Sequence, residues 1–263
     1  MTQPNDVLRQ GAVLVSALLA VVGAFIGSGA AGGIPIAKAA DGALAADATP
    51  LAPGGPAFAI WTPIYLGLLA YAVWQSLPNQ RFEERQRRLG YPIAASLLLN
   101  AAWILSIQLD ALALSIPIIV VLLIVLAVCF GIITSSRANG FVEVLLVDGT
   151  VGLYLGWVCV ATAANVAAGL HAAGFRGAGL RPDVWAVAVI ILAGTIGVLV
   201  AVWGRGRLSP TAALCWGLAW IAVARLTGDL RSSPTAVAAI VAAVVVVAVT
   251  LVLRARAPRL VSA

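Results

Sequence analysis

Eight long apolar segments follow one another along the chain, separated by short polar or Gly/Pro-rich stretches. They lie at about 12–32, 57–77, 92–109, 112–134, 143–168, 184–203, 211–228 and 235–253. Most approach the roughly 20 residues that a helix needs to cross the hydrocarbon core of a membrane. The pattern therefore predicts an all-α, polytopic integral membrane bundle of about eight transmembrane helices.

Two of the separating stretches need comment. The break at Asp110 is short, but the roughly 40 residues from Pro92 to Ser136 exceed one span and suit a tight helical hairpin. The stretch 81–88 (RFEERQRR) is rich in charge and is expected to be a solvated segment beside anionic lipid. The sequence thus predicts a turn at the first and an exposed surface segment at the second.

Composition excludes other classes of protein. Of the 263 residues 62% are hydrophobic and 10% charged, and the mean hydropathy is +1.05, whereas soluble domains are about half apolar and a quarter charged. The net charge of +6 does not indicate nucleic acid, because the basic residues form no cluster interleaved with aromatics. Cys129, Cys159 and Cys215 are widely spaced in apolar runs, which is typical of packing residues and not of a disulfide framework or metal site.

The positive residues predict an orientation in the cell membrane. With the N-terminus inside, eleven arginines are cytoplasmic: Arg9, Arg81, Arg85, Arg87, Arg88, Arg137, Arg205, Arg207, Arg254, Arg256 and Arg259. Only Lys38, Arg176, Arg181 and Arg231 fall outside, and Arg225 lies within the seventh span. Because cytoplasmic loops carry the excess of Lys and Arg, both termini are expected in the cytoplasm.

Two ionisable residues inside spans are candidates for function, since the bilayer makes such groups costly. Asp148 in the fifth span either couples to a proton or ion or caps a neighbouring loop. Arg225 in the seventh span precedes Asp229 by four residues, so a local ion pair or snorkelling toward the interface accounts for it.

Three spans each place aromatic and amide residues on one face, within an arc of about 60° at about 100° per residue. The members are Phe58, Trp61 and Tyr65; Ser96, Asn100 and Trp103; and Tyr154, Trp157, Ala161 and Asn165. Asp148 points about 120° away from Tyr154 and does not share that face. The outer-half depth of most of these residues predicts either a ligand pocket or a set of helix-packing contacts.

Three motifs resemble a known family. GGPAFAIWTPIYLGLLAYAVWQ (residues 54–75), LLLNAAW (residues 97–103) and YLGWVCVATAAN (residues 154–165) are similar to the second, third and fifth helices of the tryptophan-rich sensory protein family. This TspO/MBR family comprises the bacterial relatives of the mitochondrial translocator, or peripheral benzodiazepine receptor. The resemblance spans about residues 10–170.

The resemblance implies a five-helix bundle that binds porphyrins, sterols and synthetic aromatic ligands. It assigns to the pocket Trp61, Tyr65, Asn100, Trp103, Tyr154, Trp157, Ala161 and Asn165. The first outer loop, about Gly33 to Pro56, would be its lid, although here it lacks the tryptophan that this family carries before the second helix. The acidic residue common early in the family's fourth helix is absent, and Leu114 and Ser115 occupy that neighbourhood.

The sequence therefore predicts a five-helix membrane domain at residues 1–170 and a three-helix extension at residues 171–263. The expected function is binding of a small hydrophobic planar ligand, porphyrin-like or sterol-like, for sensing or transport. The alternative is a secondary transporter that uses Asp148 for ion coupling. An enzyme ranks third, because the chain has neither a zinc motif nor a nucleophile elbow; a porphyrin-modifying activity would have to rest on tryptophan chemistry. The sequence indicates no cofactor, no metal ligand and no catalytic residue; a porphyrin is expected only as a ligand.

The glycine pairs Gly23/Gly27 and Gly152/Gly156 allow two helices to approach closely. They serve either packing within the chain or contact between the two copies of a homodimer.

Overall fold

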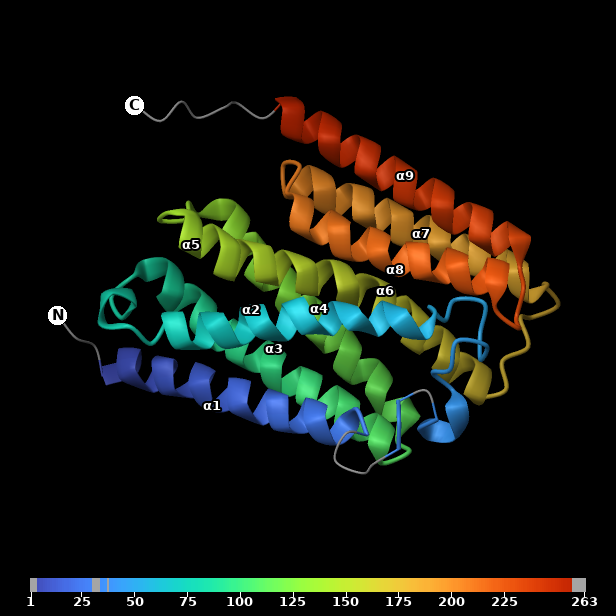
Figure 1. Ribbon diagram of the computed structural model, residues 1–263, viewed down its shortest axis with the longest axis horizontal. Coiled ribbons are helices and arrows are strands. Elements are labelled where there is room, and N and C mark those ends of the chain that lie inside the picture. Colours follow the sequence, from blue (N-terminus) through green and yellow to red (C-terminus); the bar gives the residue numbers. More distant parts are fainter. Residues whose placement is uncertain (1–3, 30–33, 37, 257–263) are drawn as a thin grey trace.

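The computed structural model describes residues 4–29, 34–36 and 38–256. Within these residues eight helices are long and apolar enough to cross a membrane. The helical elements of the spans are α1 (Pro4–Gly27), η2 (Gly55–Ile60) with α2 (Trp61–Trp74), α3 (Glu84–Gln108), α4 (Leu112–Ser135), α5 (Phe141–Glu143) with η4 (Val144–Gly149) and α6 (Thr150–Ala172), α7 (Pro182–Trp203), α8 (Leu208–Thr227) and α9 (Ser233–Arg256). The predicted all-α membrane bundle is confirmed (Figure 1).

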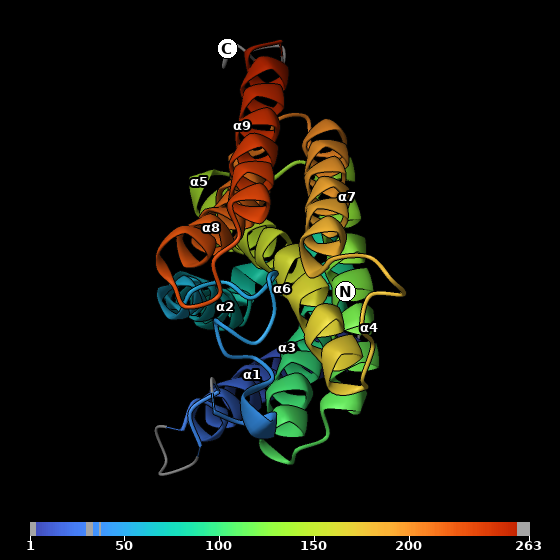
Figure 2. The ribbon, with the colours of Figure 1, turned by 90° about the vertical axis from the view of Figure 1, so that its right-hand side faces the viewer.

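The helices do not pack in chain order. Helix α3 lies between α1 and α4, α4 packs on α6, and α6 packs on α8. Helix α7 packs chiefly on α9 and touches α6, its predecessor in the chain, only lightly. Figure 2 shows α7 and α9 side by side at one edge of the bundle. Of the last three helices, α8 is the one that packs closely on α6. These three helices are therefore joined to the rest mainly through α8.

The close contact between α6 and α8 depends on glycine. A methyl group at Gly156 would collide with the backbone carbonyl of Pro210, and one at Gly152 would collide with the Ser209 side chain. On the other side of the molecule, Gly23 lies against Ala101 of α3. These glycines therefore serve helix packing within the chain, as small residues do in membrane helices.

Helix α3 begins earlier than the sequence predicted. It starts at Glu84 instead of about residue 92, and Arg85 and Gln86 are buried. The expectation that residues 81–88 form a solvated segment is wrong for this part of the stretch. The reason is tertiary: Arg85 is paired with Glu143 and Asp148, and Gln86 donates a 2.8 Å hydrogen bond to Glu143.

The predicted turn at Asp110 is confirmed. Helix α3 ends at Gln108 and α4 starts at Leu112, and Asp110 adopts a positive φ of 55°. Its carboxylate accepts a 3.2 Å hydrogen bond from the Ala40 backbone of the first loop. The end of the predicted first span at residues 30–32, Gly33 of the predicted lid and Arg259 lie outside the described residues.

Candidate functional site

Aromatic side chains from α2 and α6 form one cluster. The Trp61 ring centroid lies 5.6 Å from that of Tyr65, 5.8 Å from that of Tyr154 and 6.2 Å from that of Trp157. Phe58, from η2, packs edge-on against Trp157 at 5.9 Å. The common face predicted from helical spacing therefore brings these five rings into contact, and all pairs but the tilted Trp61–Tyr65 pair have the edge-to-face geometry that aromatic rings favour.

Amide groups link α3 to the same region. Asn100 donates a 2.6 Å hydrogen bond to the Tyr65 hydroxyl. The Trp103 indole donates a 3.0 Å bond to Asn165, and Asn165 in turn donates a 2.8 Å bond to the Ser115 hydroxyl of α4. Each of these two amides thus has at least one partner, as an apolar environment requires, although the Asn100 Oδ1 has none among the described residues. Ser115, in the first turn of α4, accepts the end of this chain of hydrogen bonds.

A small cavity of about 40 Å³ lies beside the aromatic cluster. Five of the eight predicted pocket residues line it: Trp61, Trp103, Trp157, Ala161 and Asn165. The other three, Tyr65, Asn100 and Tyr154, do not line it. Tyr154 instead donates a 3.3 Å hydrogen bond to the Ser96 carbonyl. The lining therefore divides the predicted set into residues that face the cavity and residues that support it.

The cavity has further lining residues that the sequence did not assign to a pocket. They are Phe58, which the sequence placed only on the face shared with Trp61 and Tyr65, and Val160, Ala164 and the loop residues Ala43, Leu44, Thr49, Ala52 and Pro53. Ala164 lies one helical turn beyond Ala161, so its spacing could have indicated it. The loop residues carry no periodic signal, because an irregular segment is positioned by its tertiary contacts.

The first loop covers this cavity and is held in place by α8. Arg225, only 1% exposed, donates to the carbonyl of Thr49 at 3.1 Å and to that of Ala46. Two further bonds join the same elements: Gly54 donates its amide to Trp220 at 3.2 Å, and Trp216 donates its indole N–H to Ala57 at 2.8 Å. Hydrogen bonds to α8 thus hold the predicted lid in position.

This geometry corrects the interpretation of Arg225. The guanidinium neither pairs with Asp229 nor snorkels to the interface; it is buried against loop carbonyls. A buried guanidinium needs acceptors to compensate for lost hydration, and the loop backbone supplies two of them, while the Arg225 Nε has no partner among the described residues. Helical spacing indicated only Asp229, four residues after Arg225, because it carries no information on acceptors in a distant loop.

Asp148 lies outside the aromatic cluster and away from the small cavity. It is 4% exposed, in the π-helical segment η4. At a rise of about 1.5 Å per residue it is about 9 Å along the helix from Tyr154 and about 25 Å from Asn165. Its carboxylate accepts from Arg85 and, at 2.6 Å, from Arg207, which immediately precedes α8. Glu143 adds a second carboxylate, 2.9 Å from Arg85. The four side chains form a charge-balanced cluster that joins α3, η4 and the α7–α8 connection.

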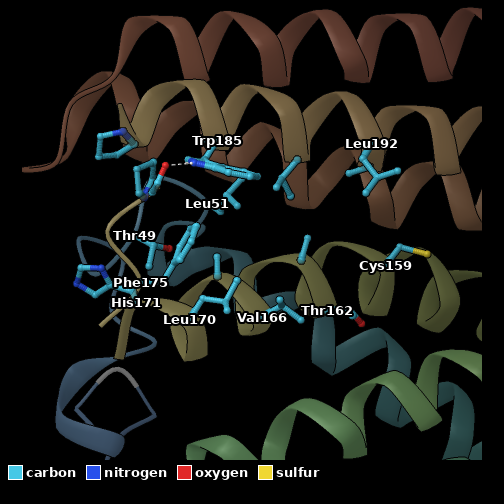
Figure 3. Close-up of a pocket in the computed structure, with 18 of the residues that line it drawn as sticks. Thr49, Leu51, Cys159, Thr162, Val166, Leu170, His171, Phe175, Trp185 and Leu192 are labelled. Atoms are coloured by element: carbon cyan, nitrogen blue, oxygen red, sulfur yellow. Dashed lines mark hydrogen bonds between the residues drawn. The ribbon is translucent and has the colours of Figure 1, made fainter. Parts of the chain in front are cut away.

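A larger cavity, of about 470 Å³, lies on the opposite side of α6, between α4, α6 and α7 (Figure 3). It is separate from the cavity at the aromatic cluster, although Thr49 lines both. The sequence did not predict this cavity, because no feature of the sequence indicated which helices pack on α7.

Comparison with known protein families gives a match over most of the chain. The model of the TSPO-like protein family matches residues 13–252, so the match extends beyond residue 170, where the recognisable motifs end, and includes α7 to α9. No curated protein and no solved structure matches the chain.

Proposed function

Because this chain belongs to the TSPO-like protein family, we propose that it is a multi-pass protein of the cell membrane that binds a small hydrophobic planar molecule for sensing or transport. The proposed site is the cavity between α2, α3 and α6 beneath the first loop. Its orientation follows the distribution of positive residues, with both termini in the cytoplasm.

The observation that carries this proposal is the composition of the cavity wall. Three tryptophans from three helices, Trp61, Trp103 and Trp157, surround the space, and Asn165 supplies an amide. Aromatic walls with few polar groups suit a flat apolar ligand, because the faces provide contact area and the polar groups fix its orientation. Trp157 also has a buried indole N–H with no hydrogen-bond partner among the described residues, which is free to donate to a ligand.

The size of the cavity bears on how a ligand would enter. A volume of about 40 Å³ is well below the roughly 300–1,000 Å³ of sites for drug-sized ligands. A porphyrin-sized molecule therefore requires the first loop to lift. The bonds that Arg225 and Trp216 donate, and the one that the Trp220 carbonyl accepts from Gly54, make α8 the anchor against which that movement takes place.

The test is a tryptophan-fluorescence titration of purified protein with protoporphyrin and with a sterol. Ala161 faces the cavity, so Ala161→Leu is expected to weaken binding by about tenfold or more, given an overpacking cost of roughly 1–3 kcal/mol. Saturable quenching in the parent protein, reduced in this variant, supports the proposal. Accumulation of the ligand in proteoliposomes would favour transport over sensing.

The control must lie outside both cavities. Ala167 lines the larger cavity and is therefore unsuitable. Ala248 is exposed on α9, so Ala248→Leu is expected to bind like the parent. Equal binding by the parent and Ala161→Leu, with both folded, would contradict the proposed site.

A further inference from the structure

The larger cavity is long and follows α6 and α7. Its wall runs along α6 from Cys159 to His171 and along α7 from Pro182 to Ile196 (Figure 3). At about 1.5 Å per residue the α6 wall is about 18 Å long. That length is close to half of the roughly 30 Å hydrocarbon core. Since the end at His171 belongs to the outer side in the expected orientation, the cavity extends through about one leaflet.

The space exists because α7 is held away from α6. Helix α7 packs chiefly on α9, and the α6–α7 connection is braced at the outer end. There, Trp185 donates a 2.8 Å hydrogen bond to the Gly177 carbonyl and its ring contacts Phe175 at 5.7 Å. Below this brace the facing positions carry small side chains, including Ala163 and Ala193. The gap is therefore built into the structure by residue size and bracing.

The interior of this cavity offers apolar contact. Thr162 satisfies its hydroxyl within the helix, donating to the Val158 carbonyl at 2.7 Å. Leucine, isoleucine, valine and alanine side chains supply most of the remaining wall, with Cys159 at the inner end. An occupant of the inner part gains by burying hydrocarbon and finds little to hydrogen-bond.

Polar groups gather at the outer end. Thr49 is 5% exposed, and its hydroxyl has no hydrogen-bond partner among the described residues. Such a buried hydroxyl is costly unless a further group bonds to it. Arg176 and His171 line the same end and are exposed, and Arg176 forms no ion pair with any described residue. The nearby Asp183 is already engaged by Arg181 and Ser232.

We propose that this cavity binds a long-chain carboxylic acid, with its hydrocarbon chain between α6 and α7 and its carboxylate at Arg176 and Thr49. The length matches a single chain within one leaflet, and the volume lies within the range of small-molecule sites. The cation at the mouth and the N-terminus of α7, where Pro182 lines the cavity, both favour a negative head group. This site is distinct from that of the proposed function and does not depend on it.

The chain-binding part is tested with dibromostearic acid, whose bromines quench an indole that they contact. The protein is placed in phosphatidylcholine nanodiscs, and quenching of its tryptophan fluorescence is titrated. Saturable quenching is expected, with Trp185 as the reporter in the cavity wall. In Ala163→Phe, which fills the cavity, the affinity is expected to fall about tenfold or more, a loss equivalent to about 1.4 kcal/mol. Ala248→Phe, at an exposed position on α9, is the matched control and should bind like the parent.

Two outcomes would overturn this part of the proposal. One is equal affinity in the parent and Ala163→Phe, with both variants folded. The other is an experiment with nanodiscs of brominated phosphatidylcholine, in which the lipid quenches the tryptophan fluorescence of the parent. If Ala163→Phe abolishes this quenching and added stearic acid does not relieve it in the parent, the occupant is a bilayer phospholipid.

The head-group part is tested by comparing dibromostearic acid with its methyl ester. The parent is expected to bind the acid at least about tenfold more tightly, which is the lower end of what a hydrogen bond to a charged group contributes. Arg176→Gln should lose this preference and still bind the ester as the parent does. Arg231→Gln, an exposed arginine on the same expected side, should keep the preference. Equal affinity of the parent for acid and ester would refute the assigned head group.

The tests of the two cavities can be read separately. Protoporphyrin titration of Ala163→Phe reports on the proposed function, and dibromostearic acid titration of Ala161→Leu reports on the second cavity. Failure of one site therefore remains distinguishable from failure of the other.

Discussion

At the scale of single residues, Asp148 illustrates how a costly group is accommodated. Its carboxylate accepts from Arg85 and Arg207, so it satisfies two cations that belong to different helical elements. The transporter alternative requires an aspartate that gains and loses a proton during transport. The observed pairing instead favours a structural role, in which removing the charge leaves Arg85 buried with a single carboxylate partner.

Asp148→Asn is accordingly expected to lower the stability of the protein. Breaking a buried ion pair by removing one partner costs roughly 3–5 kcal/mol, which should appear as a lower Tm in detergent, while the folded fraction keeps its ligand affinity. Asp229→Asn, at an exposed position, should leave the Tm unchanged. If Asp148→Asn instead keeps its Tm and loses a pH-dependent uptake, the ion-coupling alternative is correct.

At the scale of elements, the contact between α6 and α8 determines how the last three helices join the rest. Helix α8 lies so close to α6 that Gly156 faces the Pro210 carbonyl directly. The same helix carries Arg225, Trp216 and Trp220, which hold the first loop. The packing of α8 and the position of the lid are therefore physically coupled.

Gly156→Ala is expected to force α6 and α8 apart. A rigid backbone carbonyl cannot move aside as a flexible side chain can, so the cost should be about 1–3 kcal/mol and the Tm should fall. Gly11→Ala is the matched control, since a methyl group there meets nothing within 4 Å and alanine favours the helix by up to about 1 kcal/mol. An equal Tm in the two variants would show that α8 is not seated on α6 in this way.

At the scale of the whole molecule, the positive residues predict which ends of the helices face the cytoplasm. The Arg85–Asp148–Arg207 cluster lies at the end expected inside, and the first loop and the α6–α7 connection lie at the other end (Figure 1). In this expected orientation both cavities would lie in the outer half of the membrane, where ligands from the outer leaflet would reach them.

This orientation is checked by cysteine labelling in a variant without the three native cysteines. Arg88→Cys and Arg137→Cys are expected to be protected from a membrane-impermeant reagent added outside, whereas Asp41→Cys and Asp229→Cys should be labelled. All four positions are exposed, so protection reports on the membrane side and not on burial. Labelling of position 88 from outside, with position 41 protected, would reverse the assignment.

The eight spans, the turn at Asp110 and the shared face of the aromatic residues were determined by the sequence itself. Each follows from a local property: the transfer of a run of side chains into hydrocarbon, or the angular period of one helix. Such properties need no knowledge of neighbouring elements. They also placed on common helix faces the five predicted residues that line the smaller cavity, although their assignment to a pocket came from the family resemblance.

Tertiary structure alone decided the partners of the charged residues and the empty space between helices. Arg85 became helical and buried because Glu143 and Asp148, some sixty residues later, accept its hydrogen bonds. Arg225 turned to the carbonyls of a loop about 180 residues earlier. The larger cavity exists because α7 packs chiefly on α9 and only lightly on α6. The physical reason is common to all three: a helix's own period shows which face is apolar or polar, whereas the group that meets that face depends on how the helices assemble.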